Sequence, residues 1–272
     1  MSAPPPEPFV DVHCHLLPGI DDGAASWDDT LAMARMAVAD GTETIVVTPH
    51  QLGNFAHNDG QTIRRRTAEL QDALNAQRIP LRVLPGADVR IEDDMVARLR
   101  QGSVLTLADR RRHVLLELPH ELYFPLEPVL DQLGQHEMVG ILSHPERNQG
   151  LLALRGLIAP LVDAGCLMQL TAGSLTGSFG PVVQQFAEQI VHQGLAHLVA
   201  TDAHGSKSRR PLMSRAFQRL IDLADRPTAV ALCCHNPSHV AAGSHVEPGR
   251  RAAGRRTAPK GVGRWLPWRK AG

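Results

Sequence analysis

Short runs of apolar residues alternate with longer amphipathic stretches along most of the chain. Each run is bounded by Gly, Pro or polar residues, which is typical of a short buried strand. The stretches between the runs have helical periodicity, as after Ser26, where a capping-box-like arrangement precedes a stripe containing Leu31 and Met36 and ends at Gly41. The pattern predicts seven strands, at residues 9–15, 43–50, 82–88, 113–119, 138–144, 166–172 and 197–204.

The spacing of these strands predicts the fold class. Their ends follow one another at intervals of about thirty residues, which is one βα unit each time. Repeated βα units predict either a (β/α) barrel or an open doubly wound sheet. Seven units, with no glycine-rich dinucleotide fingerprint after the first strand, favour the barrel. We therefore expect an α/β barrel over residues 1–242, followed by a basic, disordered segment at residues 243–272.

Histidine and acidic residues stand at the ends of six of the predicted strands. In a parallel barrel these ends lie on one face, where active sites are built. A lone buried His is more often a hydrogen-bonded structural residue than a ligand. Six such strand ends together predict a metal site, because these side chains are costly in a core unless they are paired or bind metal. The candidate ligands are His13, His15, Asp22, His50, Asp88, Glu117, His144, Asp202 and His204.

The size and chemistry of this set predict several ions and an anionic substrate. A first-row ion takes roughly four to six ligands counting water, so nine candidates suit two or three ions with a bridging carboxylate. Mixed imidazole and carboxylate ligands favour Zn, Mn or Fe over Ca or Mg and argue against a thiolate site. Three divalent ions would exceed the charge of the four carboxylates, and hydroxide plus phosphate would balance the excess. The set therefore predicts a metal-dependent phosphoesterase.

The formal net charge of zero conceals an uneven distribution of charge. Eight basic residues and no acidic ones follow position 249, which leaves 20 basic and 28 acidic residues in the preceding body. The acidic body argues against a nucleic-acid partner. Four cysteines without disulfide spacing, no bilayer-length apolar run and no signal-peptide pattern predict a cytoplasmic protein. The basic segment is interpreted as solvated; the alternative is weak contact with an anionic membrane surface.

Four motifs together resemble a known family. They are HCHLLPGIDDGA at residues 13–24, TPH at 48–50, SHPER at 143–147 and DAH at 202–204. In this order they resemble the PHP (polymerase and histidinol phosphatase) superfamily. The stretch at residues 15–24 resembles more specifically the bacterial capsule and exopolysaccharide tyrosine-protein phosphatases of the CpsB/CapC type. The resemblance runs from about residue 9 to residue 211.

The resemblance implies a distorted (β/α)₇ TIM-like barrel, the PHP fold, with a trinuclear centre that is commonly manganese, with Fe, Zn or Mg as alternatives. It implies phosphotyrosine as the substrate, on the tyrosine-rich tail of an autophosphorylating kinase of polysaccharide export. All nine candidates fall on the family's ligand positions. Arg147 and Arg209 fall on its phosphate-binding arginines, and the adjacent Arg210 could take that role instead. Two residues depart from the pattern: Asp88 replaces the usual Glu, which puts bridging in doubt, and Gln51 replaces a second histidine that could support the ligands.

The predicted mechanism is in-line attack on phosphorus by a metal-bridging hydroxide. Arg147 and Arg209 would hold the non-bridging oxygens, and Asp202 or His204 would act as general acid through water. A cysteine nucleophile is not indicated, since no Arg stands six positions after any of the four cysteines, and Cys14 is interpreted as packing between two ligands. Three alternatives remain open: a small-molecule phosphatase of the histidinol-phosphate kind, a nuclease on the same centre, and a metal-binding regulator without catalysis.

Overall fold

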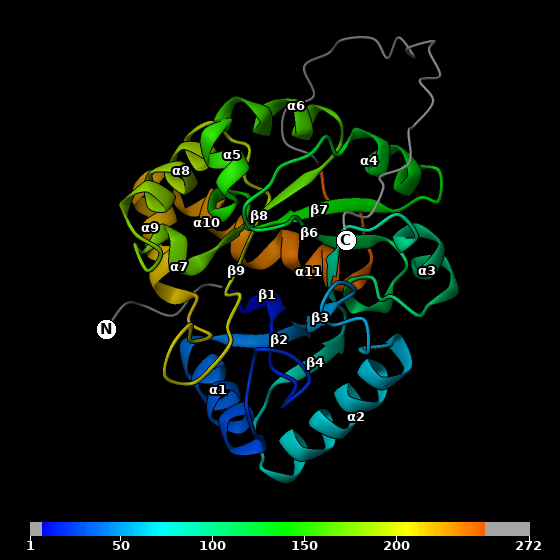
Figure 1. Cartoon of the computed structure of the whole chain (residues 1–272). Helices are drawn as coiled ribbons and strands as arrows, with labels where there is room; N and C mark the ends of the chain where they lie inside the picture. The colour runs from blue at the N-terminus through cyan, green and yellow to red at the C-terminus, as the bar shows by residue number, and fades with distance from the viewer. Residues whose placement is uncertain (1–6, 248–272) are drawn as a thin grey trace.

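Strands and helices alternate through residues 7–247, the part of the chain that a computed structural model describes (Figure 1). All pairings between the strands are parallel, as predicted. The strands form two sheets, in the orders β1-β2-β4 and β3-β5-β6-β7-β8-β9. Their bounds are Phe9–Cys14 for β1, Thr42–Val47 for β2, His50–Gln51 for β3, Arg82–Pro85 for β4, Asp88–Arg90 for β5, His113–Glu117 for β6, Val139–Ser143 for β7, Leu167–Thr171 for β8 and Leu198–Ala200 for β9.

The second and third predicted strands are each divided in two, which is a correction to the sequence-based expectation. The second is β2 followed by β3, with a break at Thr48 and Pro49, because proline has no N–H to donate to a ladder. The third is β4 followed by β5, with a break at Gly86. A Cβ at Gly86 would lie 2.7 Å from Cγ1 of Val46, so the backbone passes this side chain too closely for any other residue.

The two sheets approach each other where β1 and the segment after β9 end. An isolated parallel bridge joins Cys14 to Ala203, and the backbone N–H of Asp202 donates to the carbonyl of His13 at 2.7 Å. The N–H of His15 donates in turn to the carbonyl of Ala203 at 2.9 Å. These contacts, with the chain running on from β2 to β3 and from β4 to β5, give a distorted seven-unit barrel. Its two sheets are not joined into one closed ring of strands within residues 7–247.

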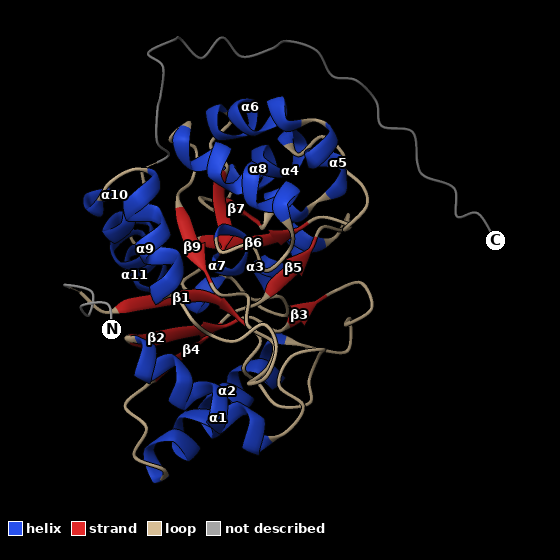
Figure 2. Cartoon of the chain, turned by 90° about the vertical axis from the view of Figure 1, so that its left-hand side faces the viewer, coloured by secondary structure: helices blue, strands red, loops and turns tan. Residues whose placement is uncertain are grey.

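Helices cover both sheets on the outside (Figures 1 and 2). α1 and α2 lie beside the β1-β2-β4 sheet, and α4, α5, α6 and α8 lie over the larger one. Near the C-terminus, η4 and α11 pack against β1 and β9. The helices are α1 Trp27–Asp40, α2 Gly60–Ala76, α3 Met95–Gln101, α4 Glu127–Gly134, α5 Gln149–Ala153, α6 Ile158–Asp163, α7 Ala172–Leu175, α8 Pro181–His192, α9 Ser214–Leu223, α10 Arg226–Val230 and α11 Asn236–Ala242, with 3₁₀ turns η1 Leu107–Asp109, η2 Pro145–Arg147 and η3 Arg155–Leu157 and the π-helical η4 Ala231–His235.

Helix α1 begins and ends where the sequence predicts. The Ser26 hydroxyl accepts from the N–H of Asp29 at 3.3 Å, and Gly41 adopts the left-handed conformation with φ of 104°. Two of its carboxylates hold the loop after β9. Asp29 accepts from the N–H of Ser206 at 3.1 Å, and Asp40 accepts from the N–H of Ser214 at 2.8 Å. Helix α1 therefore fixes the segment that carries the last predicted site residues.

The barrel interior is aliphatic below the predicted ligands. Side chains from six strands form one buried cluster, and α11 contributes two further side chains to it. Its members include Val12, Val46, Leu115, Ile141, Leu167, Leu198, Val240 and Ala241. No helix in residues 7–247 is long and apolar enough to cross a membrane. α11 ends at Ala242, and residues 248–272 of the predicted basic segment lie outside the described residues.

Candidate metal centre

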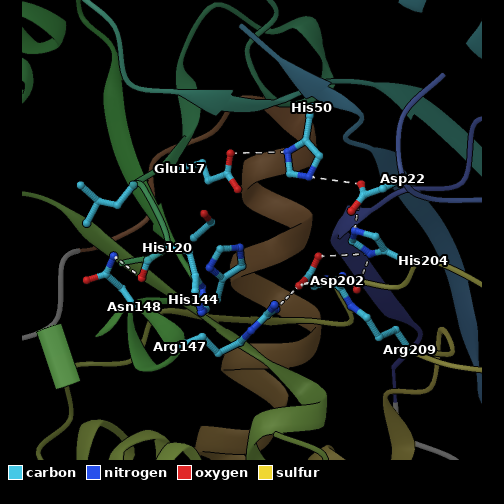
Figure 3. A pocket seen from close by; sticks show the side chains of 12 residues that line it. Asp22, His50, Glu117, His120, His144, Arg147, Asn148, Asp202, His204 and Arg209 are labelled. Atoms are coloured by element: carbon cyan, nitrogen blue, oxygen red, sulfur yellow. Dashed lines mark hydrogen bonds and ion pairs between the residues drawn. The ribbon is translucent and has the colours of Figure 1, made fainter. Parts of the chain in front are cut away.

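All nine predicted ligands lie together at the C-terminal ends of the strands, and Figure 3 shows six of them around one pocket. Their donor atoms form four overlapping groups, each with atoms within 4.8 Å of one another. Overlap means that one side chain belongs to two groups, as expected where neighbouring ions share ligands. The groups are His15, Asp22, His50 and His204; His13, His15 and Asp88; His13, His144 and Asp202; and His50, Asp88 and Glu117.

The two histidines of the first strand are aimed at the centre by partners behind them. Nδ1 of His13 lies 2.8 Å from Oε1 of Gln169 on β8, and Nδ1 of His15 lies 2.8 Å from Oδ2 of Asp21. The two Nε2 atoms then face each other at 3.2 Å. Asp21 also accepts from the backbone N–H of His50 at 3.1 Å. Such outer partners fix the ring orientation of metal-binding histidines.

Sequence reasoning missed both of these supporting residues. Asp21 lies inside the motif at residues 13–24, next to Asp22, and its role is to hold His15 rather than to face the pocket. Gln169 is a fully buried polar residue in a strand that otherwise reads as apolar. A buried amide in the middle of this strand was the signal that could have placed it at the site.

The protonation of this pair reflects the surrounding carboxylates. Burial lowers the pKa of His13 to about 3. Burial also acts on His15, but hydrogen bonds to Asp202 and Asp21 outweigh it and raise its pKa to about 10. The carboxylates therefore stabilise a positive charge at His15. A divalent cation, which requires deprotonated imidazole, would take the place of that proton.

Asp88 gives the clearest indication that a cation fits here. Its side chain is completely buried, and neither carboxylate oxygen meets hydrogen-bond geometry with any group in residues 7–247. The nearby Ser143 hydroxyl donates instead to the carbonyl of Leu116 at 3.0 Å. Burial, with the neighbouring Glu117 carboxylate, raises the pKa of Asp88 well above its usual range. A buried carboxylate in this situation is stabilised when it binds metal.

The strand register explains why the shorter Asp88 still reaches two groups of ligands. His50 on β3 pairs directly with Asp88 on β5. Oδ2 of Asp88 lies 3.5 Å from Nδ1 of His50 and 3.5 Å from Nε2 of His13. Nδ1 of His50 is another buried atom without a hydrogen-bond partner in the described chain. The carboxylate therefore lies between two candidate ligand groups although it is one methylene shorter than Glu.

Asp202 joins the histidines to the arginines. It follows β9 with φ of 50°, and its side chain is 1% exposed. Oδ1 lies 3.2 Å from Nε2 of His13, while Oδ2 pairs with both Arg147 and Arg209. Burial opposes its ionisation, but the neighbouring histidines and Arg209 outweigh burial and hold the pKa of Asp202 well below its usual range. An ionised, doubly paired carboxylate is poorly suited to the role of general acid.

The two predicted arginines line the same pocket (Figure 3). Arg147 lies on η2, and its guanidinium packs over the ring of Phe179 at 4.2 Å from the centroid. Arg209, with φ of 46°, lies in the loop held by Asp29. Arg210 is exposed and is not among the pocket-lining residues of the described chain, so Arg209 is the better placed of the two.

Gln51, which stands in place of a second histidine, makes its side-chain hydrogen bonds to backbone groups of two loops. Its amide nitrogen donates to the carbonyls of Asn58 at 2.8 Å and Ser103 at 3.1 Å, and its oxygen accepts from the N–H of Leu105 at 2.8 Å. It therefore ties β3 to two loops.

Cys14 is fully buried, as predicted, and burial raises the pKa of its thiol well above the usual range. Such a thiol is a poor nucleophile.

A family model described as capsular polysaccharide synthesis, CpsB/CapC, matches residues 9–242. Tyrosine-protein phosphatase YwqE of Bacillus subtilis is 36% identical over 203 residues, which cover 74% of this chain and 79% of that protein. Putative tyrosine-protein phosphatase CapC of Staphylococcus aureus is 29% identical and covers 77% of this chain and 82% of its own length.

A solved structure of the same kind of protein as these relatives also resembles this chain. It comes from work on YwqE of Bacillus subtilis and CpsB of Streptococcus pneumoniae, described as unique metal-dependent tyrosine phosphatases. It superposes with a TM-score of 0.85 at 31% identity, covering 89% of this chain and 98% of that one. Dihydropyrimidinase of Brevibacillus agri, with a TM-score of 0.51 and 10% identity over 85% of this chain and 70% of that one, shares the fold alone.

Proposed function

The chain belongs to the CpsB/CapC family of capsular polysaccharide synthesis proteins, and on that premise we propose that it is a metal-dependent protein-tyrosine phosphatase. One observation carries the proposal. The imidazoles and carboxylates of six strand ends converge on the same pocket as Arg147 and Arg209. A site with several cations and two guanidinium groups suits the binding and hydrolysis of a phosphate monoester.

The nine converging side chains would hold two to three divalent ions, most suitably manganese. The mixture of imidazole and carboxylate donors supports a first-row metal. Asp88 belongs to two ligand groups and would help to hold the ions, although its side chain is shorter than that of Glu. When bound, the ions supply Lewis acidity and lower the pKa of water, so that hydroxide forms near neutral pH.

The arginines bind and orient the phosphoryl group. Each guanidinium is planar and presents paired N–H donors that match two phosphate oxygens. The shared pairing with Asp202 keeps Arg147 and Arg209 turned toward the centre before substrate binds. Stacking on Phe179 limits the motion of Arg147 further. Preorganised donors of this kind stabilise the charge that spreads over the phosphoryl oxygens in the transition state.

The substrate that we propose is phosphotyrosine on a tyrosine kinase of capsule or exopolysaccharide export, within its tyrosine-rich tail. The names of the relatives support the class of reaction, and the family description supports the pathway. We place the protein in the bacterial cytoplasm. Contact of residues 243–272 with the inner membrane surface remains part of the proposal and rests on their basic composition alone.

A side-by-side assay tests this function against the two alternatives on the same centre. Purified protein is analysed for metal content and then given a phosphotyrosine peptide, histidinol phosphate and single-stranded DNA. We expect two to three ions per chain and the highest kcat/KM with the phosphotyrosine peptide. A preference for histidinol phosphate or DNA by tenfold or more would refute the assignment.

A further inference from the structure

The reaction needs a proton donor that the predicted ligands do not supply. The tyrosine oxygen leaves phosphorus as a phenolate, whose conjugate acid has a pKa of about 10. A positioned acid is therefore useful at neutral pH. We infer that the imidazole of His120 is this general acid, an inference that rests on the proposed phosphatase function.

The ligand side of the pocket is unsuited to proton donation. Oδ2 of Asp202 pairs with both Arg147 and Arg209, and its Oδ1 lies 3.2 Å from Nε2 of His13. Oδ1 of Asp22 lies 3.5 Å from Nε2 of His50 and 3.5 Å from Nε2 of His204, within one of the candidate ligand groups. Arginine does not release its proton in this pH range. The remaining carboxylates and imidazoles on this side are the residues to which we assign the ions.

The pocket-lining residues that are neither candidate ligands nor arginines are Leu118, His120, Ser143 and Asn148. The Ser143 hydroxyl is buried and donates to a backbone carbonyl. The Asn148 amide nitrogen donates to the carbonyls of Pro119 at 2.7 Å and Leu122 at 3.0 Å. His120 is exposed, and its ring makes no hydrogen bond or ion pair within the described residues. Among the pocket-lining residues of the described chain, it is thus the one imidazole that is not assigned to the ions.

The backbone of His120 is fixed relative to the phosphate-binding arginine. Its carbonyl accepts from the N–H of Gln149 at 2.9 Å and from the amide of Asn148 at 3.4 Å. Asn148 directly follows Arg147, so these hydrogen bonds tie the loop after β6 to the η2 turn. In Figure 3, His120 and Asn148 lie on the side of the pocket away from Asp22 and His204. A phosphoryl group held by Arg147 can therefore direct its leaving oxygen toward His120.

His120 donates a proton to the leaving tyrosine oxygen in this step. An oxygen derived from water bonds to phosphorus, and the bond from phosphorus to the tyrosine oxygen breaks. The electron pair of that bond stays on the tyrosine oxygen, which takes the proton of the His120 imidazolium. Tyrosine and inorganic phosphate leave, and neutral His120 regains a proton from solvent.

The dependence of the rate on the leaving group tests this role. His120→Gln and His120→Ala are assayed with a phosphotyrosine peptide and with p-nitrophenyl phosphate, whose phenol is a much stronger acid and needs no donor. We expect kcat/KM for the peptide to fall about 10²-fold, as is typical for loss of a general acid. The rate with p-nitrophenyl phosphate should change less than about threefold, and metal content should not change.

His136→Gln is the matched control, since His136 is also exposed but lies before β7, at the other end of the barrel. It should behave as wild type with both substrates. Equal losses with both substrates in the His120 variants, or no loss with the peptide, would overturn the assignment of His120 alone. A manganese-loaded wild-type protein that hydrolyses neither substrate would overturn the proposed function as well.

Discussion

Replacing Arg147 by Ala should remove transition-state binding while leaving the candidate metal centre assembled. The side chain is 16% exposed, and within residues 7–247 its one ion pair is with Asp202, which keeps Arg209 and His13 as partners after the substitution. The nine candidate ligands are unchanged. We therefore expect the metal content to stay at the wild-type level and the protein to lose only about 1 kcal/mol of stability with the stacking on Phe179.

The loss of activity follows from the hydrogen bonds that Arg147 can offer. A charge-assisted hydrogen bond contributes roughly 1.5–3 kcal/mol, and a guanidinium can make two with a phosphoryl group. Arg209 and the ions share the same oxygens, so we take the effect of Arg147 as about 3 kcal/mol. That corresponds to about a 10²-fold lower kcat/KM. Lysine keeps the charge but not the planar guanidinium, so Arg147→Lys should recover only part of the lost kcat/KM.

Steady-state kinetics with a phosphotyrosine peptide, paired with metal analysis of each variant, measures both expectations. Arg155→Ala is the matched control, because Arg155 also packs over a ring, that of Phe186 at 5.0 Å, and does not line the pocket of the described chain. The control should keep wild-type kcat/KM. A rate for Arg147→Ala within about threefold of wild type, or a fall in rate matched by loss of metal, would refute the assigned role.

Three further results are expected. Asp21→Asn should weaken metal binding about 10- to 100-fold, because the partner that orients His15 is lost; competition with a chelator measures it. EDTA should abolish activity and manganese restore it, whereas thiol alkylation of the native protein should have no effect, because Cys14 is buried. Between pH 7 and pH 5 the free energy of unfolding should fall by about 2 kcal/mol through His197, as urea midpoints would record.

Stability should fall at low pH because the pKa of His197 is lower in the folded state than in the unfolded chain. Burial lowers the pKa of His197 to about 4, below the unfolded value of 6.5, and its Nδ1 accepts from the N–H of Met168 at 3.0 Å. The unfolded chain therefore binds more protons, and stability is lost as the pH falls from the unfolded pKa toward the folded one. His197→Gln should flatten this dependence, while the exposed His192→Gln should not.

Control measurements distinguish the expected effects on metal binding and on activity from a loss of folding. Asp28→Asn, on the exposed start of α1, should bind metal as wild type does. Equal affinities for Asp21→Asn and wild type would contradict the orienting role of Asp21. Activity that survives EDTA but not alkylation would contradict the metal mechanism.

The sequence alone determined which residues could meet and on which face. Apolar runs at regular intervals favour a parallel barrel, and a parallel barrel places every strand end on one face. For that reason His13, His50 and Glu117 could be grouped before any contact was known. The limits of α1 were equally local, since Ser26 and Gly41 act within one helical turn.

Tertiary structure decided the direction of each side chain and what stands behind it. Gln169 supports His13 from a segment far away in the sequence. Asp21 supports His15 through a turn whose shape the sequence does not reveal. Gln51 bonds to backbone groups of two loops that the sequence does not place beside it. Of two adjacent arginines, Arg209 lines the pocket of the described chain and Arg210 is exposed, which the sequence did not decide. Strand periodicity fixes a face, but it does not extend past the strand end, where turns and long-range hydrogen bonds set the orientation.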